Sequence, residues 1–138
     1  MFILHCGDDL AFSAHSYTAA FFAKTENGCF PAAGWTDFPQ TVLEWWKNEI
    51  KSVSTGSDRY TYRFGFMDGP YTILCRKTGG KLTLSFLRDT VRTLPDCETS
   101  VPEMVSAIRS ATETLKRRLY LAGRPEYIPP LDGILRDL

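Results

Sequence analysis

The chain offers few side chains of the kinds that carry out chemistry. Its two histidines, His5 and His15, could act as general bases or as a catalytic pair. Neither lies in a motif of a nucleophilic site, and His5 falls on a predicted strand. We therefore predict no catalytic residue and no enzyme. Catalysis by His5 or His15 is kept as a minor alternative, which juxtaposition with a thiol or a carboxylate would favour.

Metal ions and phosphates also lack a recognisable site. Asp8 and Asp9 are adjacent carboxylates, but no further ligand stands at metal-binding spacing from them. Gly79-Gly80 is typical of a hairpin turn and lacks the flanking pattern of a phosphate-binding loop. The sequence therefore predicts neither a metal nor a cofactor.

The cysteines indicate a reducing environment. Cys6, Cys29, Cys75 and Cys97 are widely spaced, and a disulfide framework would need a secreted chain. The first residues show no export signal, and no apolar run reaches the roughly 18 residues of a membrane span. We expect a cytoplasmic protein with reduced, mostly buried thiols.

Charge is balanced over the chain but not along it. The sequence has 16 basic and 16 acidic residues, which argues against non-specific nucleic-acid binding. The first 50 residues, however, hold two lysines against six acidic residues, a net charge of −4. Our hypothesis is that Asp8, Asp9 and Glu26 face a basic protein partner. A solvated acidic surface without a partner is the alternative.

Alternating apolar residues predict several strands. The segment 10–24 is ambiguous, because its aromatic residues and threonines favour a strand or hairpin arm while its alanines permit a helix; we favour strand. Pro95 is expected to end the last strand. The predicted strands are Phe2–His5, 10–24, 60–66, Tyr71–Lys77, Lys81–Arg88 and Thr90–Leu94.

Two amphipathic helices are predicted. Asp37 as a cap and Pro39 in the first turn mark the start of a helix that runs to about Val53. Trp45 and Trp46 lie about 100° apart on it, so one should enter the core and the other stay partly exposed.

The second helix begins at a capping box formed by Ser100 and Glu103 and ends before Gly123. The apolar residues of the tail should pack back on the body. Together these elements predict one α+β domain over 1–138, an antiparallel sheet of four to six strands with two main helices packed on one face.

Aromatic residues on the sheet raise the question of nucleic acids. Tyr60, Tyr62 and Phe64 could stack on bases, but Arg59 and Arg63 should point to the opposite face. We expect the rings to lie beneath the helices instead, and we predict no nucleic-acid partner.

Two motifs are familiar as a pair. The first comprises Phe30 to Pro39 followed by Val42 to Trp46, and the second comprises Phe66 to Tyr71. Together they resemble small bacterial immunity proteins, found beside the toxins of contact-dependent inhibition and other polymorphic toxin systems. The resemblance covers residues 28 to 77.

The resemblance implies a cytoplasmic antidote that binds a cognate toxin domain, as a monomer or in a 1:1 complex, without being an enzyme. A nuclease toxin would suit the acidic first third. The alternative is a small-ligand or regulatory module with an aromatic pocket. We interpret the motif residues as scaffold rather than contact surface: Gly34, Trp35, Asp37, Phe38, Pro39, Trp45, Trp46, Met67, Asp68, Gly69, Pro70 and Tyr71.

Overall fold

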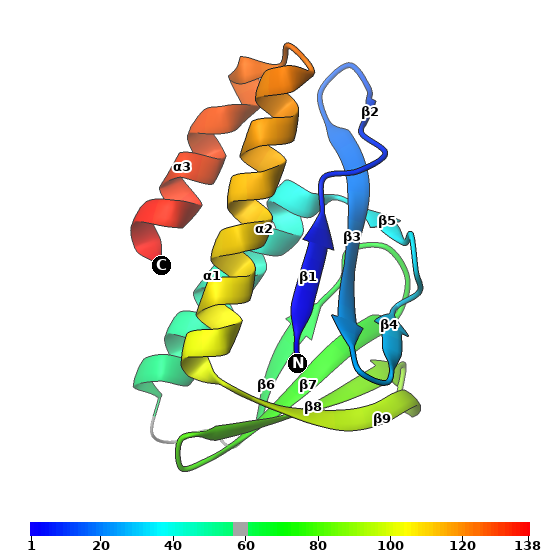
Figure 1. The fold of residues 1–138 in the computed structure, drawn as a ribbon, viewed down its shortest axis with the longest axis vertical. Coiled ribbons are helices and arrows are strands. Elements are labelled where there is room, and N and C mark those ends of the chain that lie inside the picture. Colours follow the sequence, from blue (N-terminus) through cyan, green and yellow to red (C-terminus); the bar gives the residue numbers. More distant parts are fainter. Residues whose placement is uncertain (57–60) are drawn as a thin grey trace.

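A computed structural model describes residues 1–56 and 61–138 of the chain. Within them the chain forms nine strands in two antiparallel sheets, three α-helices and one short 3-10 helix. The helices lie along one side of the molecule, the five-stranded sheet stands beside them, and the four-stranded sheet closes the lower end (Figure 1). The predicted α+β class is confirmed, with the difference that the strands divide into two sheets.

Strand β3 (Tyr17–Thr25) is the centre of the first sheet. Strands β1 (Ile3–Cys6) and β4 (Gly28–Phe30) both pair with Ala23 and Lys24, so they lie on opposite edges of β3. The two shorter strands, β2 (Ala11–Phe12) and β5 (Thr36–Asp37), pair with the earlier part of β3. One long strand thus aligns four short ones.

The ambiguous segment 10–24 is a hairpin arm, as predicted. Strands β2 and β3 are joined by a turn in which the Ser13 N–H donates to the Ser16 carbonyl at 2.9 Å. Along β3, Tyr17, Phe21 and Ala23 face the core, and Lys24 faces solvent. The aromatic and β-branched residues prevail over the helix propensity of the alanines because the sheet buries their side chains.

The second sheet has the order β6-β7-β8-β9, so each strand pairs with the next along the chain. Tyr62 and Phe64 are buried, as the alternation predicts, whereas Arg59 and Tyr60 lie outside the described residues. The bounds of the strands are β6 Thr61–Gly65, β7 Tyr71–Thr78, β8 Lys81–Arg88 and β9 Val91–Ser100.

The prediction that Pro95 ends the last strand is wrong. Strand β9 continues to Ser100, with a bulge where the partners of β8 shift from Leu94 opposite Phe86 to Cys97 opposite Leu84. β9 is the edge strand of its sheet, and a bulge at an edge tolerates a residue without an N–H.

Helix α1 (Pro39–Thr55) has the predicted proline in its first turn and is followed by Gly56. Its cap differs from the prediction: the N-cap residue is Phe38, with no side-chain cap. The prediction that one of the two tryptophans enters the core is confirmed: Trp46 is fully buried, and Trp45 is 45% exposed.

Trp46 joins the two sheets. Its ring packs against Phe21 of β3 at 5.3 Å and against Phe64 of β6 at 5.4 Å between centroids. Its indole N–H donates to the Gly65 carbonyl at 2.8 Å, so the polar atom of this buried ring is satisfied. A single hydrophobic core therefore spans both sheets and the helices.

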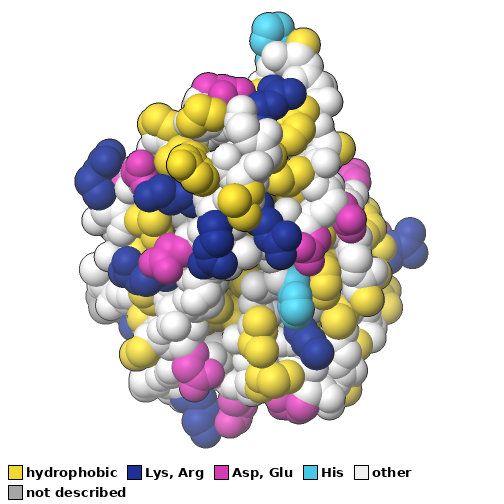
Figure 2. Space-filling model, turned by 45° about the horizontal axis from the view of Figure 1, so that its top comes forward, with side chains coloured by type: hydrophobic (Ala, Val, Ile, Leu, Met, Phe, Trp, Pro, Cys, Tyr) yellow, Lys and Arg dark blue, Asp and Glu magenta, His cyan; other side chains and the backbone are white. Residues whose placement is uncertain are grey.

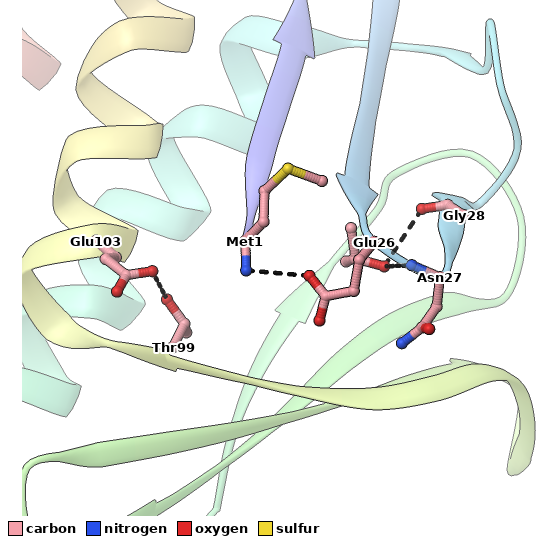
Figure 3. A network of polar contacts seen from close by, with 7 residues as sticks. Met1, Glu26, Asn27, Gly28, Thr99 and Glu103 are labelled. Atoms are coloured by element: carbon pink, nitrogen blue, oxygen red, sulfur yellow. Dashed lines mark hydrogen bonds and ion pairs between the residues drawn. The ribbon is translucent and has the colours of Figure 1, made fainter.

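Helix α2 (Val101–Leu121) begins at Ser100, whose hydroxyl accepts the Glu103 N–H at 3.3 Å. The predicted capping box is only half formed, because the Glu103 carboxylate accepts from the Thr99 hydroxyl at 2.9 Å (Figure 3). No helix formed by the described residues is long and apolar enough to cross a membrane.

The tail packs back on the body, as expected, in the form of a further helix. A 3-10 turn, η1 (Pro125–Tyr127), leads into α3 (Ile128–Asp137), which buries Leu131 and Ile134 against the core. Lys47 of α1 reaches Asp137 at 3.2 Å, which fastens the end of α3 to α1.

Candidate functional site

The two histidines have different surroundings. The ring of His5 stacks on Phe22 at 4.8 Å with an interplanar angle of 3°. His15 lines a cavity beside Ser16 and Tyr17, and no thiol or carboxylate is among the described residues that line it. In residues 1–56 and 61–138, no three His, Cys, Asp or Glu side chains are grouped so that they could hold a metal ion.

The cysteines are free thiols, three of them buried and Cys29 half-buried. Burial raises the pKa of Cys75 and of Cys97 to about 11, and it raises the pKa of Cys6 further. Because the thiolate is the nucleophile, these three groups are protonated and unreactive at neutral pH. Their place is in the packing of the core.

The two family-like motifs meet at the buried carboxylate of Asp37, which is 1% exposed. It accepts the Phe38 N–H at 2.7 Å, the Trp35 indole N–H at 3.2 Å and the Asp68 N–H at 3.2 Å. Asp37 is therefore not the N-cap of α1: its carboxylate joins the strand before α1 to the turn between β6 and β7. We call Trp35, Asp37, Asp68, Gly69 and Tyr71 the Asp37 junction.

Ring packing completes the Asp37 junction. The rings of Trp35 and Tyr71 meet edge to face at 5.0 Å, and Tyr71 also meets Phe30 at 5.7 Å. Gly69 has φ of +77°, and a Cβ there would stand 3.0 Å from the Tyr71 ring, so a larger residue would be strained at this position. These motif residues hold parts of the fold together.

The remaining motif residues are divided between surface and interior. Pro39 and Trp46 are buried, whereas Trp45 and Met67 are largely exposed. Gly34 lies in the turn in which the Trp35 N–H donates to the Ala32 carbonyl. Pro70 is exposed in the β6–β7 turn, where its carbonyl accepts the Asp89 N–H.

The three acidic residues of our charge hypothesis lie at two places along β3. Asp8 lies beside the middle of β3, where its carbonyl accepts the Ala20 N–H at 2.7 Å, and Asp9 follows it. Glu26 lies past the far end of β3, so roughly 20 Å of strand separates it from Asp8. A contact that included all three residues would have to extend along β3 from Asp8 and Asp9 to Glu26.

Glu26 takes part in contacts near the lower end of the first sheet (Figure 3). Its carboxylate accepts from the Met1 amino group at 3.1 Å, and this hydrogen bond lowers the pKa of Glu26. In the adjoining turn, the Thr25 hydroxyl accepts the Asn27 N–H at 3.0 Å. The Glu26 carboxylate thus has a partner within the chain, the Met1 amino group.

A pronounced exposed apolar feature lies at the opposite end of the molecule. Tyr120 and Leu121, in the last turn of α2, are 70% and 73% exposed. They lie off the buried stripe of α2, which ends at Leu119. We call Tyr120 and Leu121 the helix-end ridge.

The helix-end ridge stands between two shallow grooves. One, between α2 and α3, has a volume of about 430 Å³ and is lined by Tyr120, Ile128, Leu135, Glu113, Lys116 and Arg117. The other, of about 550 Å³, lies against the β1–β2 connection and is lined by Leu121, Ala122, Leu10, Gly7, Asp8, Asp9 and Arg118. Each groove is therefore bordered by one residue of the ridge and by charged side chains.

Charges of both signs border the helix-end ridge. Arg118 reaches Asp8 at 3.1 Å, and Lys116 reaches Asp132 of α3 at 2.6 Å. Figure 2, in which this end is turned toward the viewer, shows hydrophobic side chains with Lys, Arg, Asp and Glu around them. An apolar centre within a charged rim is the usual anatomy of a protein-binding surface.

A smaller cavity lies close by, at the start of α1. It measures about 170 Å³ and is lined by three rings, those of Tyr17, Phe38 and Tyr127, and by the polar residues His15, Ser16, Gln40 and Thr41. One of its walls, Tyr127, precedes Ile128, which lines the groove between α2 and α3.

The sequence contained a signal for the helix-end ridge that periodicity arguments pass over. Tyr120 and Leu121 are large apolar residues about 100° and 200° away from Leu119 around the helix, outside the stripe that the core requires. The cavity had no such signal, because its lining comes from three separate segments.

No family model, curated protein or solved structure matches the chain. The resemblance of residues 28 to 77 to immunity proteins therefore stays a prediction.

Proposed function

We propose that the protein is an antidote that binds a cognate bacterial toxin domain in a 1:1 complex in the cytoplasm and blocks it. It acts by occupying a surface of the toxin rather than by catalysis. The resemblance of the two motifs to immunity proteins supports this proposal, and the helix-end ridge supplies a surface for binding.

The observation that carries the proposal is the exposure of Tyr120 and Leu121 between two grooves. Leaving a large apolar side chain in water costs about 1.5–3 kcal/mol relative to burying it. Tyrosine is enriched among the few residues that supply most of the free energy of protein association. A partner that covers the helix-end ridge recovers that free energy.

The charged rim would select the partner. Asp8 and Asp9 lie in the groove beside Leu121, and both are exposed. A basic toxin, such as a nuclease, would approach these carboxylates favourably, while the cations of α2 would align its acidic groups. Replacing Asp8 and Asp9 by lysine should therefore slow association, and unchanged affinity would remove them from the contact.

The test begins with tagged protein expressed in the native organism while the toxin gene is active. We expect one stoichiometric partner, identified by mass spectrometry as the C-terminal domain of a large exported protein. The isolated domain should arrest growth, and co-expression of the antidote should restore growth. If no partner is recovered, or if growth is not restored, the antidote proposal is wrong.

A ridge variant locates the surface. The double change Tyr120→Ser and Leu121→Ser should lower affinity at least about 100-fold while leaving thermal unfolding unchanged, since neither side chain enters the core. The matched control is Val91→Ser, at a site that is 66% exposed at the start of β9. Equal affinity of the ridge variant and the control would place the contact elsewhere.

The alternative from the sequence is a small-ligand module with an aromatic pocket. The cavity beside Tyr17 and Tyr127 is the feature that matches it, but its volume of about 170 Å³ is small. Pockets for whole metabolites or drug-sized ligands measure about 300–1,000 Å³. The size of this cavity suits a single side chain better than an entire ligand.

A further inference from the structure

We propose that the cavity at the start of α1 is an anchor pocket for one tyrosine side chain of the protein partner. The inference rests on the proposed function for the origin of that side chain. Three observations lead to it: the volume of the cavity, its aromatic walls and the kinds of polar groups at its lining.

The volume selects a single ring. An engineered cavity of about 150 Å³ in another protein binds benzene. The cavity here measures about 170 Å³, which admits a phenol ring but leaves no room for a larger ligand to be enclosed. It is also partly open to solvent, so a side chain can enter from outside.

The walls favour an aromatic occupant. Tyr17 and Tyr127 meet at 4.7 Å between ring centroids with an interplanar angle of 55°, and Phe38 adds a third ring. Behind them, Phe12 packs on Tyr127 at 6.2 Å and is covered by the guanidinium of Arg124 at 4.2 Å. Rings that are held in place in this way offer an inserted ring edge-to-face contacts.

The polar lining favours a hydroxyl at the tip of that ring. The Gln40 carboxamide can donate and accept hydrogen bonds, as can the hydroxyls of Ser16 and Thr41. The Tyr17 hydroxyl reaches the Gln40 Oε1 only at 3.4 Å, a long hydrogen bond that a ligand can replace. A phenol hydroxyl, which also donates and accepts, matches these groups.

A charged occupant fits less well. No lysine, arginine, aspartate or glutamate is among the described residues that line the cavity. A guanidinium would therefore lose its hydration without gaining an opposite charge. Among the described lining residues, only His15 can carry a positive charge toward a carboxylate.

The test uses p-cresol, the side-chain analogue of tyrosine, with the full chain and no toxin. Titration followed by amide NMR should shift the resonances of Tyr17, Gln40, Thr41 and Tyr127, with a dissociation constant in the millimolar range. Toluene, which lacks the hydroxyl, should bind about tenfold more weakly. The variant Gln40→Leu should reduce this difference between p-cresol and toluene, and Val91→Ser should leave it intact.

Each contrary result overturns the inference. Absence of p-cresol shifts would mean that the cavity takes no phenol ring. Equal affinity for toluene would remove the role of the hydroxyl, and preferential binding of acetate or guanidinium would assign the cavity to a charged group. Because no toxin is present, these outcomes are independent of partner capture: a partner recovered without p-cresol binding sinks this inference alone.

Discussion

The Asp37 junction and the helix-end ridge use similar residue types in opposite ways. In the junction, Trp35 and Tyr71 pack on each other, and the Asp37 carboxylate receives three N–H groups of the same chain. At the ridge, Tyr120 and Leu121 project into solvent between two grooves. The first set is satisfied internally, whereas most of the surface of the second is exposed to solvent.

This difference explains why a recognisable motif need not be a binding surface. The junction must be kept intact if the strand before α1 and the β6–β7 turn are to meet, whatever the partner is. A surface that recognises one partner can change with it, because its side chains do not support the core. Under the proposed function, partner selection belongs to the helix end and fold maintenance to the junction.

The largest expected effect comes from breaking the junction. Asp37→Ala removes the buried acceptor of three part-buried N–H groups, which should lower the free energy of unfolding by about 3 kcal/mol. Chemical denaturation would measure it. Asp68→Ala is the matched control, because the contact of Asp68 with Asp37 uses its backbone N–H and its side chain is exposed. Equal stability of the two variants would refute the structural role of the carboxylate.

An intermediate effect is expected where the helix end touches the first sheet. Gly7 has φ of +108°, and a Cβ there would stand 3.0 Å from the Arg118 Cγ. Gly7→Ala should cost about 2 kcal/mol through backbone strain and contact with α2. The control is Gly80→Ala, since a Cβ at Gly80 meets nothing within 4 Å. Urea unfolding compares the two, and a harmless Gly7→Ala would show that this connection can move away from α2.

The smallest effect concerns the attachment of α3, which carries part of the groove beside Tyr120. The hydrogen bond from Lys47 lowers the pKa of Asp137 below its ordinary value of 3.8. The ionised carboxylate is thus favoured by folding, so its contribution is complete above that ordinary value and is lost as pH falls through the lower folded-state pKa.

Asp137→Asn tests this attachment. At neutral pH the variant should melt slightly below the wild type, and the difference should vanish as the pH falls below the folded-state pKa of Asp137. Thermal unfolding of both proteins would be measured from about pH 2 to about pH 7, because an aspartate titrates near pH 4 in the unfolded chain. A difference that persists at the acid end would show that the ion pair is not its cause.

Periodic elements were predictable because their signal is local. The stripe from Met104 to Leu119 and the alternation around Tyr62 and Phe64 each repeat with the period of one element, and both appear in the structure. The prediction failed at Pro95, where the outcome depends on β9 being an edge strand. It was incomplete for α3, whose two buried residues, Leu131 and Ile134, form too short a repeat to identify a helix.

The sequence by itself determined the class of fold, the hairpins of the second sheet, the start of α2 and the division of Trp45 and Trp46 into one core residue and one exposed residue. Each follows from the spacing of nearby residues, because the period of a helix or strand decides which side chains share a face. Tertiary structure alone decided that Asp37 binds the turn at Asp68, that Asp8 and Glu26 lie far apart, and that Tyr17, Gln40 and Tyr127 surround one cavity. These outcomes depend on how separate elements pack together. Residues that meet in this way are far apart along the chain, and their spacing follows no repeating pattern that the sequence would reveal.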